Sequence, residues 1–340
     1  MDVLSAAGVA AADPTVASSS LSVVVPAYNE VAVLPEFHRR LAAVLDALQI
    51  RAEIIYVNDG SSDTTRSLLL ALRETDARVA VIDLSRNFGK EIAMSAGLDH
   101  AHGDAVVVID ADLQDPPELI PDMLRAWREG FDVVLMRRRS RAQESWLKKA
   151  TARAFYRAIG RMGTIDIPEN VGDFRLLSQR AVAALRRFPE RSRFMKGLFA
   201  WIGFPCREME YDRDGRHAGE TKWNYWRLWN FALEGITSFS VVPLKVASYI
   251  GFATALTAFT YGAYVIGKTL LFGDPARGYP TLIVVVLFLG GLQLMALGII
   301  GEYLARMFIE VKQRPLYLIQ ESLPPRRPLP EPEGPASSER

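Results

Sequence analysis

The first half of the chain shows two alternating hydrophobic patterns. Between residue 21 and about residue 136, short β-branched runs alternate with segments whose apolar residues recur at helical spacing. This alternation predicts an α/β fold, a mostly parallel sheet with helices on both faces. The expected strands are 22–26, 53–58, 79–84, 105–109 and 132–135.

Two uncharged apolar runs follow in the second half, at residues 246–267 and 278–301. Runs of this length can cross roughly 30 Å of hydrocarbon as helices. The linker around residues 273–275 is short, so we expect a hairpin with both outer ends on one side of a membrane. The outer ends carry more Lys and Arg than the loop does, which predicts a multi-pass cell-membrane protein whose large domain is cytoplasmic.

Composition excludes several classes of protein. The 340 residues carry 40 basic and 39 acidic side chains, so a general nucleic-acid binder is not expected. The single cysteine, Cys206, excludes an intrachain disulfide framework and fits a reducing compartment. Residues 1–20 lack the basic start of a signal peptide.

Two carboxylates end the apolar run at 106–109. Asp110 and Asp112 are spaced i, i+2, so an extended backbone points them to the same face. Hard oxygen ligands at this position suit Mg²⁺ or Mn²⁺ carrying a diphosphate, and Gln114 could add a third oxygen. A solvated turn after the strand is the simpler alternative.

A second polar turn occupies residues 58–63. Gly60 permits a tight turn, and Asp59 at a strand end can accept hydrogen bonds from a base or ribose. A helix cap followed by a turn is the alternative, and Asp63 is expected to be such a cap.

These motifs together resemble a known enzyme family. The segments 23–30, 57–63 and 110–116 resemble family 2 glycosyltransferases of GT-A fold. The segments 85–90, 172–176 and 301–304 look like the polyisoprenyl-phosphate branch, which includes dolichol-phosphate mannose synthases and bactoprenol glucosyltransferases. The hairpin and residues 310–315 are most similar to the bactoprenol type. Asn58 stands where many relatives carry aspartate.

The resemblance implies a role for each matching residue. The donor nucleotide would be bound by Pro26, Tyr28, Glu30, Asp59 and Asp110. The metal would be held by Asp110, Asp112 and Gln114. Catalytic roles would fall to Asp112, Asp173 and Arg213, although Asp173 could instead pair with Arg175 or another cation. The diphosphate or the lipid phosphate would be bound by Arg138, Arg141, Arg216 and Lys222.

The resemblance also implies a division of the chain. We expect a disordered leader, a cytoplasmic GT-A domain, an interfacial amphipathic helix, a transmembrane hairpin and a cytoplasmic segment with a Pro-rich disordered tail. Their boundaries are 1–20, 21–222, 223–243, 244–303 and 304–340. Glycines in the two spans permit close helix packing, so a homo-oligomer is expected, and a tetramer would fit the resemblance.

The implied activity is metal-dependent, inverting transfer of a sugar from a nucleotide donor to a polyprenyl phosphate. UDP-glucose and undecaprenyl phosphate are the first choices, giving a lipid-linked sugar for cell-envelope glycosylation. A dolichol-phosphate-mannose-type synthase using GDP-mannose remains open. A processive polysaccharide synthase would normally show a Gln-x-x-Arg-Trp motif and more spans, neither of which is found. A non-catalytic membrane scaffold is the remaining alternative.

Overall fold

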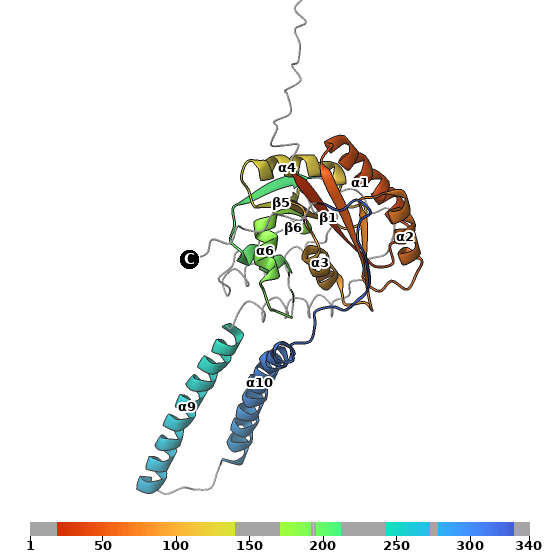
Figure 1. Cartoon of the computed structure of the whole chain (residues 1–340). Helices are drawn as coiled ribbons and strands as arrows, with labels where there is room; N and C mark the ends of the chain where they lie inside the picture. Colours follow the sequence, from red (N-terminus) through yellow and green to blue (C-terminus); the bar gives the residue numbers. More distant parts are fainter. Residues whose placement is uncertain are drawn as a thin grey trace, which may run out of the picture.

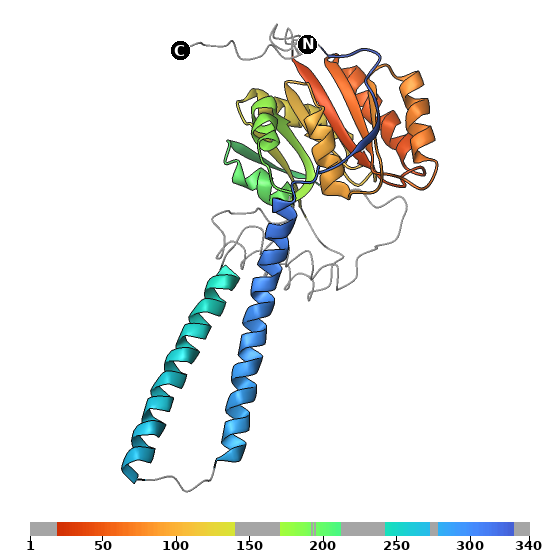
Figure 2. The ribbon, with the colours of Figure 1, turned by 60° about the horizontal axis from the view of Figure 1, so that its bottom comes forward.

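The computed structural model describes residues 19–139, 171–191, 193, 195–211, 242–272 and 278–329. These residues form an α/β domain from which two long helices project side by side (Figures 1 and 2). The expected interfacial helix at 223–243 lies almost entirely outside the described residues, and the expected leader lies outside them up to residue 18.

A mixed sheet of eight strands forms the centre of the domain. In spatial order the strands are β7 (Cys206–Tyr211), β5 (Val133–Arg138), β6 (Val171–Ser178), β4 (Ala105–Val108), β1 (Ser20–Ala27), β2 (Arg51–Asn58), β3 (Val79–Leu84) and β8 (Ile319–Leu323). Four pairings are parallel: β1 with β2 and β4, β2 with β3, and β5 with β7. Strands β6 and β8 pair antiparallel with their neighbours. The predicted α/β fold is confirmed, and β1 to β5 fall at the five expected strands.

Helices cover both faces of the sheet because buried strand residues alternate between the two faces. On one face, Val23 and Val25 of β1 pack in a core cluster with side chains of α1 (Leu34–Leu48), α2 (Thr65–Thr75) and α4 (Ile120–Arg128). On the other face, Val24 packs with α3 (Lys90–Asp99), α6 (Gln179–Arg186) and α7 (Met195–Trp201). A 3₁₀ turn, η1 (Pro117–Leu119), leads into α4.

The projecting hairpin consists of α9 (Val242–Phe272) and α10 (Tyr279–Val311). The expected spans 246–267 and 278–301 fall within these two helices, apart from residue 278. Among the described residues, one stretch, Phe288–Val311 of α10, is long and apolar enough to cross a membrane. Large apolar side chains on both helices are exposed, including Phe259 and Leu294. Insertion of α9 stays a prediction.

After α10 the chain returns to the domain and adds β8 to the edge of the sheet. Strand β8 pairs antiparallel with β3, and Arg66 of α2 forms ion pairs with Asp83 of β3 and Glu321 of β8. Before β8, the Tyr317 hydroxyl donates to Asp99 at 2.9 Å. This strand was not predicted, because its five residues place three consecutive polar side chains between Ile319 and Leu323 and so lack the alternation of a strand. The hairpin is therefore tied to the domain on its C-terminal side by a sheet edge.

Candidate donor and catalytic site

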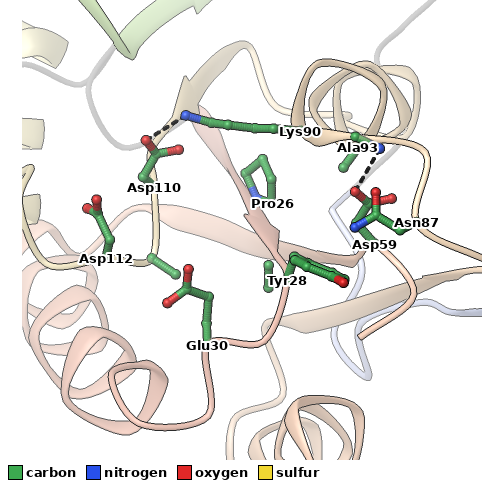
Figure 3. A pocket seen from close by; sticks show the side chains of 12 residues that line it. Pro26, Tyr28, Glu30, Asp59, Asn87, Lys90, Ala93, Asp110 and Asp112 are labelled. Carbon is green, nitrogen blue, oxygen red and sulfur yellow. Dashed lines mark hydrogen bonds and ion pairs between the residues drawn. The ribbon is translucent and has the colours of Figure 1, made fainter. Parts of the chain in front are cut away.

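A cavity of about 350 Å³ opens at the carboxyl ends of β1, β2 and β4. Parallel strands present these ends at one edge of a sheet, where ligands commonly bind. The register places the ends of β1 and β2 level, because Ala27 pairs with Asn58, and β4 ends beside Val24, three residues earlier along β1. Figure 3 shows the polar side chains that converge on this cavity from the three strand ends and from the start of α3.

Six of the nine described residues that were proposed from the sequence line this cavity. They are Pro26, Tyr28, Glu30, Asp59, Asp110 and Asp112. Gln114 is buried, with 4% of its surface exposed, and does not line the cavity. Arg141, Arg213, Arg216 and Lys222 lie outside the described residues. The individual roles of all these residues stay predictions.

The first two loops at this edge are joined by hydrogen bonds. Asn29 adopts a left-handed conformation with φ of 56°, and its side-chain oxygen accepts from the Ser62 backbone N–H at 2.9 Å. The Asn29 N–H donates to the Ser61 hydroxyl oxygen at 3.0 Å, and the Glu30 N–H donates to that of Thr65 at 3.0 Å. Short polar side chains therefore hold the segment carrying Tyr28 and Glu30 beside the segment carrying Asp59.

Asp59 fixes a third loop over the cavity. Its Oδ1 accepts from the Phe88 N–H at 2.7 Å and its Oδ2 from the Gly89 N–H at 2.9 Å. Burial raises the pKa of Asp59, and these two hydrogen bonds oppose that change. Gly60, with φ of 62°, lies so close that an added Cβ would stand 2.4 Å from the Arg86 carbonyl carbon. The loop at 85–89 is thus positioned by Asp59 and by the lack of a side chain at Gly60.

The side chain of Asn58, the residue before Asp59, contacts strand β3. The Asn58 amide donates to Oδ1 of Asp83 at 2.6 Å, and Arg66 donates to the other oxygen of Asp83 at 2.7 Å. An aspartate at position 58 would put a second carboxylate against Asp83. The asparagine therefore fits its neighbour on β3.

Lys90 joins two of the carboxylates. Its Nζ lies 2.6 Å from Oδ2 of Asp110 and also contacts Oδ2 of Asp173 on β6. Burial raises the pKa of Asp110 to about 6, against the lowering effect of Lys90. Burial acts in the same direction on Asp173, but the nearby cations, Lys90 first, hold the pKa of its carboxyl well below the usual range. The cation beside the Asp173 carboxylate is thus Lys90.

Arg175, the other partner considered for Asp173, is turned elsewhere. Its guanidinium donates to the backbone carbonyls of Gly172 and Asp173 and stacks over the Phe199 ring. Burial lowers the pKa of Arg175 to about 10.

Sequence reasoning named neither Lys90 nor Glu91 as a site residue. Glu91 lies in the first turn of α3, and its carboxylate accepts from the Met195 N–H at 3.0 Å. Burial, with Asp173 nearby, raises the pKa of Glu91 to about 7. A signal was present for Lys90, because a lysine at a helix N-terminus opposes the helix dipole and needs a compensating anion.

The turn after β4 is held in an uncommon backbone conformation. Leu113 is buried with φ of 60°, a region that costs a branched side chain about 1–2 kcal/mol. The Gln114 N–H donates to Oδ1 of Asp112 at 3.1 Å. Beyond it, the Tyr211 hydroxyl donates to the buried Asp115 carboxylate. This turn directs Asp112 toward the cavity.

Arg138, predicted to bind phosphate, lies beside this turn. Its Nη2 is 4.0 Å from Oδ1 of Asp115, and its Nε donates to the Tyr211 hydroxyl oxygen at 3.3 Å. An internal carboxylate therefore partly compensates its charge.

The carboxylate pair fits a metal that arrives with its substrate. Among the described residues, no group of three or more His, Cys, Asp and Glu side chains is arranged to hold a metal ion. Mg²⁺ is commonly bound by one or two carboxylates, with substrate phosphates and waters completing its coordination. Asp110 and Asp112, both lining the cavity, meet that requirement.

Comparison with known proteins shows which family models and which relatives this chain matches. The family model described as "Glycosyl transferase family 2" matches residues 22–186, and "GtrB C-terminal hairpin" matches residues 242–307. An uncharacterized glycosyltransferase of Synechocystis sp. is 53% identical over 88% of this chain and 95% of that protein. The SfII prophage-derived bactoprenol glucosyl transferase of Shigella flexneri is 49% identical over 89% of this chain and 98% of the relative.

A solved structure shows a more distant likeness. The glucosyl-3-phosphoglycerate synthase of Mycobacterium tuberculosis, in complex with Mn²⁺ and UDP-glucose, is 19% identical, with a TM-score of 0.43. The match covers 65% of this chain and 78% of that one.

Proposed function

The chain belongs to glycosyltransferase family 2, and from that premise we propose that it transfers glucose from UDP-glucose to a polyprenyl phosphate, with undecaprenyl phosphate as the acceptor. The observation that carries this proposal is the 49% identity to a bactoprenol glucosyl transferase, which extends over 98% of that relative. The likeness includes the C-terminal hairpin as well as the catalytic domain. The product would be a lipid-linked sugar for cell-envelope glycosylation.

We assign the donor to the cavity at the strand ends. Pro26, Tyr28, Glu30 and Asp59 would surround the nucleoside, because they line the part of the cavity formed by the first two strands. Asp110 and Asp112, with Gln114 close by, would hold Mg²⁺ or Mn²⁺. The bound metal would offset negative charge on the departing diphosphate.

The acceptor needs little chemical activation. A polyprenyl monophosphate is already an anion near pH 7, so its oxygen can attack the anomeric carbon without a strong general base. The protein then has to place the acceptor phosphate in line with the bond that breaks and to stabilise the charge on the departing diphosphate. These requirements favour a single displacement with inversion. A product that keeps the anomeric configuration of the donor would count against this mechanism.

Lys90 is the cation that lies next to Asp110 in the lining of the described cavity. An ammonium group has three donors, and two of them point to Asp110 and Asp173. The third is available to a phosphate oxygen of the donor. Asp173 would hold this ammonium in position and face the reacting phosphate. In this arrangement Asp173 and Lys90 act as a pair.

The remaining basic residues are proposed to bind phosphate groups. Arg138 and Arg141 would contact the lipid phosphate. Arg213, Arg216 and Lys222 would close over the donor diphosphate and exclude water. The hairpin supports a membrane location. We further propose that it crosses the membrane twice, that the catalytic domain is cytoplasmic and that the chain forms a homo-oligomer.

The test is transfer of label from UDP-[¹⁴C]glucose into an organic-extractable lipid by the purified full chain with undecaprenyl phosphate. We expect transfer to require Mg²⁺ or Mn²⁺. We expect the rate of transfer to be about 100-fold lower, or lower still, in Asp112→Asn. Asp122→Asn is the matched control, because Asp122 is a surface residue of α4 paired with Arg125.

Other donors and products separate the competing functions. Transfer from GDP-mannose in preference to UDP-glucose would indicate the mannose-type synthase. Label in a water-soluble polymer would indicate a processive synthase. Absence of transfer with every sugar nucleotide would contradict the enzyme.

A further inference from the structure

A second cavity, of about 330 Å³, lies where the C-terminal end of α10 meets the catalytic domain. Figure 2 shows α10 reaching the domain at this end. The walls of this cavity come from the loop before α3, from the first turn of α3, from residue 191 and from the segment 308–316. Helix α10 ends at Val311, and Gln313 adopts a left-handed conformation with φ of 46°, which turns the chain back toward the domain. The cavity is thus located at the C-terminal end of the apolar stretch that is long enough to span a membrane.

The lining of this cavity combines positive charge with apolar surface. Four cations line it and no carboxylate does: they are Arg86, Arg191, Lys312 and Arg314. No ion pair joins any of these four side chains to another described residue. The nearest acid of α10, Glu310, accepts hydrogen bonds from the Arg191 backbone N–H at 2.8 and 3.0 Å. The charge of the lining is therefore positive, and within the part of the chain that the structure describes no carboxylate forms an ion pair with its cations.

Aromatic rings hold two of these cations in place. Arg86 lies over the Phe88 ring at 4.0 Å from its centroid, and Lys312 lies over the Phe308 ring at the same distance. Phe308 is 58% exposed and Ile309 is 50% exposed, so apolar surface continues from the cavity along α10. This combination matches a molecule with an anionic head and an apolar body.

We propose that this cavity binds the phosphate headgroup of an anionic membrane phospholipid such as phosphatidylglycerol. Basic residues that directly follow an apolar span lie at the depth of such headgroups. The acceptor lipid is a less suitable occupant, because the loop at 85–90 separates this cavity from the donor cavity. Asn87, Gly89 and Lys90 line the donor cavity, whereas Arg86 and Phe88 line the second one.

The shared loop gives the site a consequence for the enzyme. Asp59 holds this loop by the backbone N–H groups of Phe88 and Gly89. A headgroup bound to Arg86 would restrain the same loop from its other face. Phospholipid binding would in this way support the donor cavity without taking part in the reaction.

The test measures lipid binding directly, so its outcome does not depend on the transferase activity. The full chain in detergent is titrated with phosphatidylglycerol or with neutral phosphatidylcholine, and bound lipid is counted by native mass spectrometry. We expect phosphatidylglycerol to be preferred and Lys312→Gln/Arg314→Gln to weaken its binding about 30-fold, since each cation near an anionic surface contributes about 1 kcal/mol. Arg125→Gln/Arg128→Gln on α4 removes the same charge away from the hairpin and should have no effect.

Arg86→Gln offers a second variant, outside the helix, if the double variant does not fold. Equal affinity of the double variant and the wild-type chain would overturn the proposal, as would equal binding of the two phospholipids. Binding of undecaprenyl phosphate but not phosphatidylglycerol would also overturn it and would indicate an acceptor site. Complete displacement of the lipid by millimolar inorganic phosphate would indicate a free-phosphate site and overturn it as well.

Discussion

Replacing Glu91 by glutamine should stabilise the catalytic domain at high pH and have little effect at low pH. Burial raises the pKa of Glu91 from 4.5 to about 7 in the folded chain. Below about pH 4.5 the carboxyl is protonated in both the folded and the unfolded chain. Between about pH 4.5 and pH 7 the unfolded chain has released this proton while the folded chain still holds it, so the wild-type chain loses stability across that interval. Glutamine resembles the protonated form and avoids that loss.

The structure sets the size of this effect. At about 1.4 kcal/mol per pKa unit, the shift of Glu91 from 4.5 to about 7 corresponds to roughly 3 kcal/mol. For a domain of about 200 residues, this is a difference in Tm of about 6–12 °C. Glutamine keeps an oxygen that can accept from the Met195 N–H, so the contact between α3 and α7 is retained.

The assay is thermal unfolding of the detergent-solubilised full chain at pH 5 and pH 8. The Tm difference between Glu91→Gln and the wild-type chain should be larger at pH 8. Glu74→Gln serves as the control, because Glu74 is a surface residue whose side chain is 69% exposed. The reasoning would be refuted if the Tm of Glu91→Gln minus that of the wild-type chain were the same at both pH values. It would also be refuted if this difference were smaller at pH 8 than at pH 5.

Three further predictions concern the site. Gly60→Ala should lower the free energy of unfolding by about 2–4 kcal/mol, because the new Cβ meets backbone atoms. Gly130 has φ of 100° and open space around it, so Gly130→Ala should show only the smaller cost of the left-handed conformation. Lys90→Met should lower kcat/KM about 100-fold, and Lys90→Arg should lower it less. The wild-type kcat/KM should rise with pH through about 6, as Asp110 ionises, and a pH-independent profile would contradict this role.

Local sequence was sufficient for the elements that surround the donor cavity. Each of the first five strands is a short apolar run, and the turn residues follow it directly. Parallel strands bring their carboxyl ends to one edge, so strand positions alone predicted that Asp59 and Asp110 would lie near each other. The resemblance to family 2 glycosyltransferases added the expected ligands around them, and the comparisons confirmed that family.

Contacts between distant segments were beyond this reasoning. Strand β8 lacks an apolar run or a regular alternation, and it pairs with the edge strand β3, which lies more than 230 residues earlier in the chain. The pairing of Lys90 with Asp110 and Asp173 joins residues that are 20 and 83 positions apart. Antiparallel insertion of β6 beside β4 brings Asp173 to this position.

The sequence by itself determined where strands, turns and apolar helices would form, because side-chain periodicity and turn chemistry act within a few residues. It also determined which carboxylates stand at strand ends. Only the tertiary structure decided which charges meet, how deeply each is buried and therefore how far each pKa moves. Those quantities depend on the low dielectric and the neighbours that the packed sheet provides, and no local pattern encodes them.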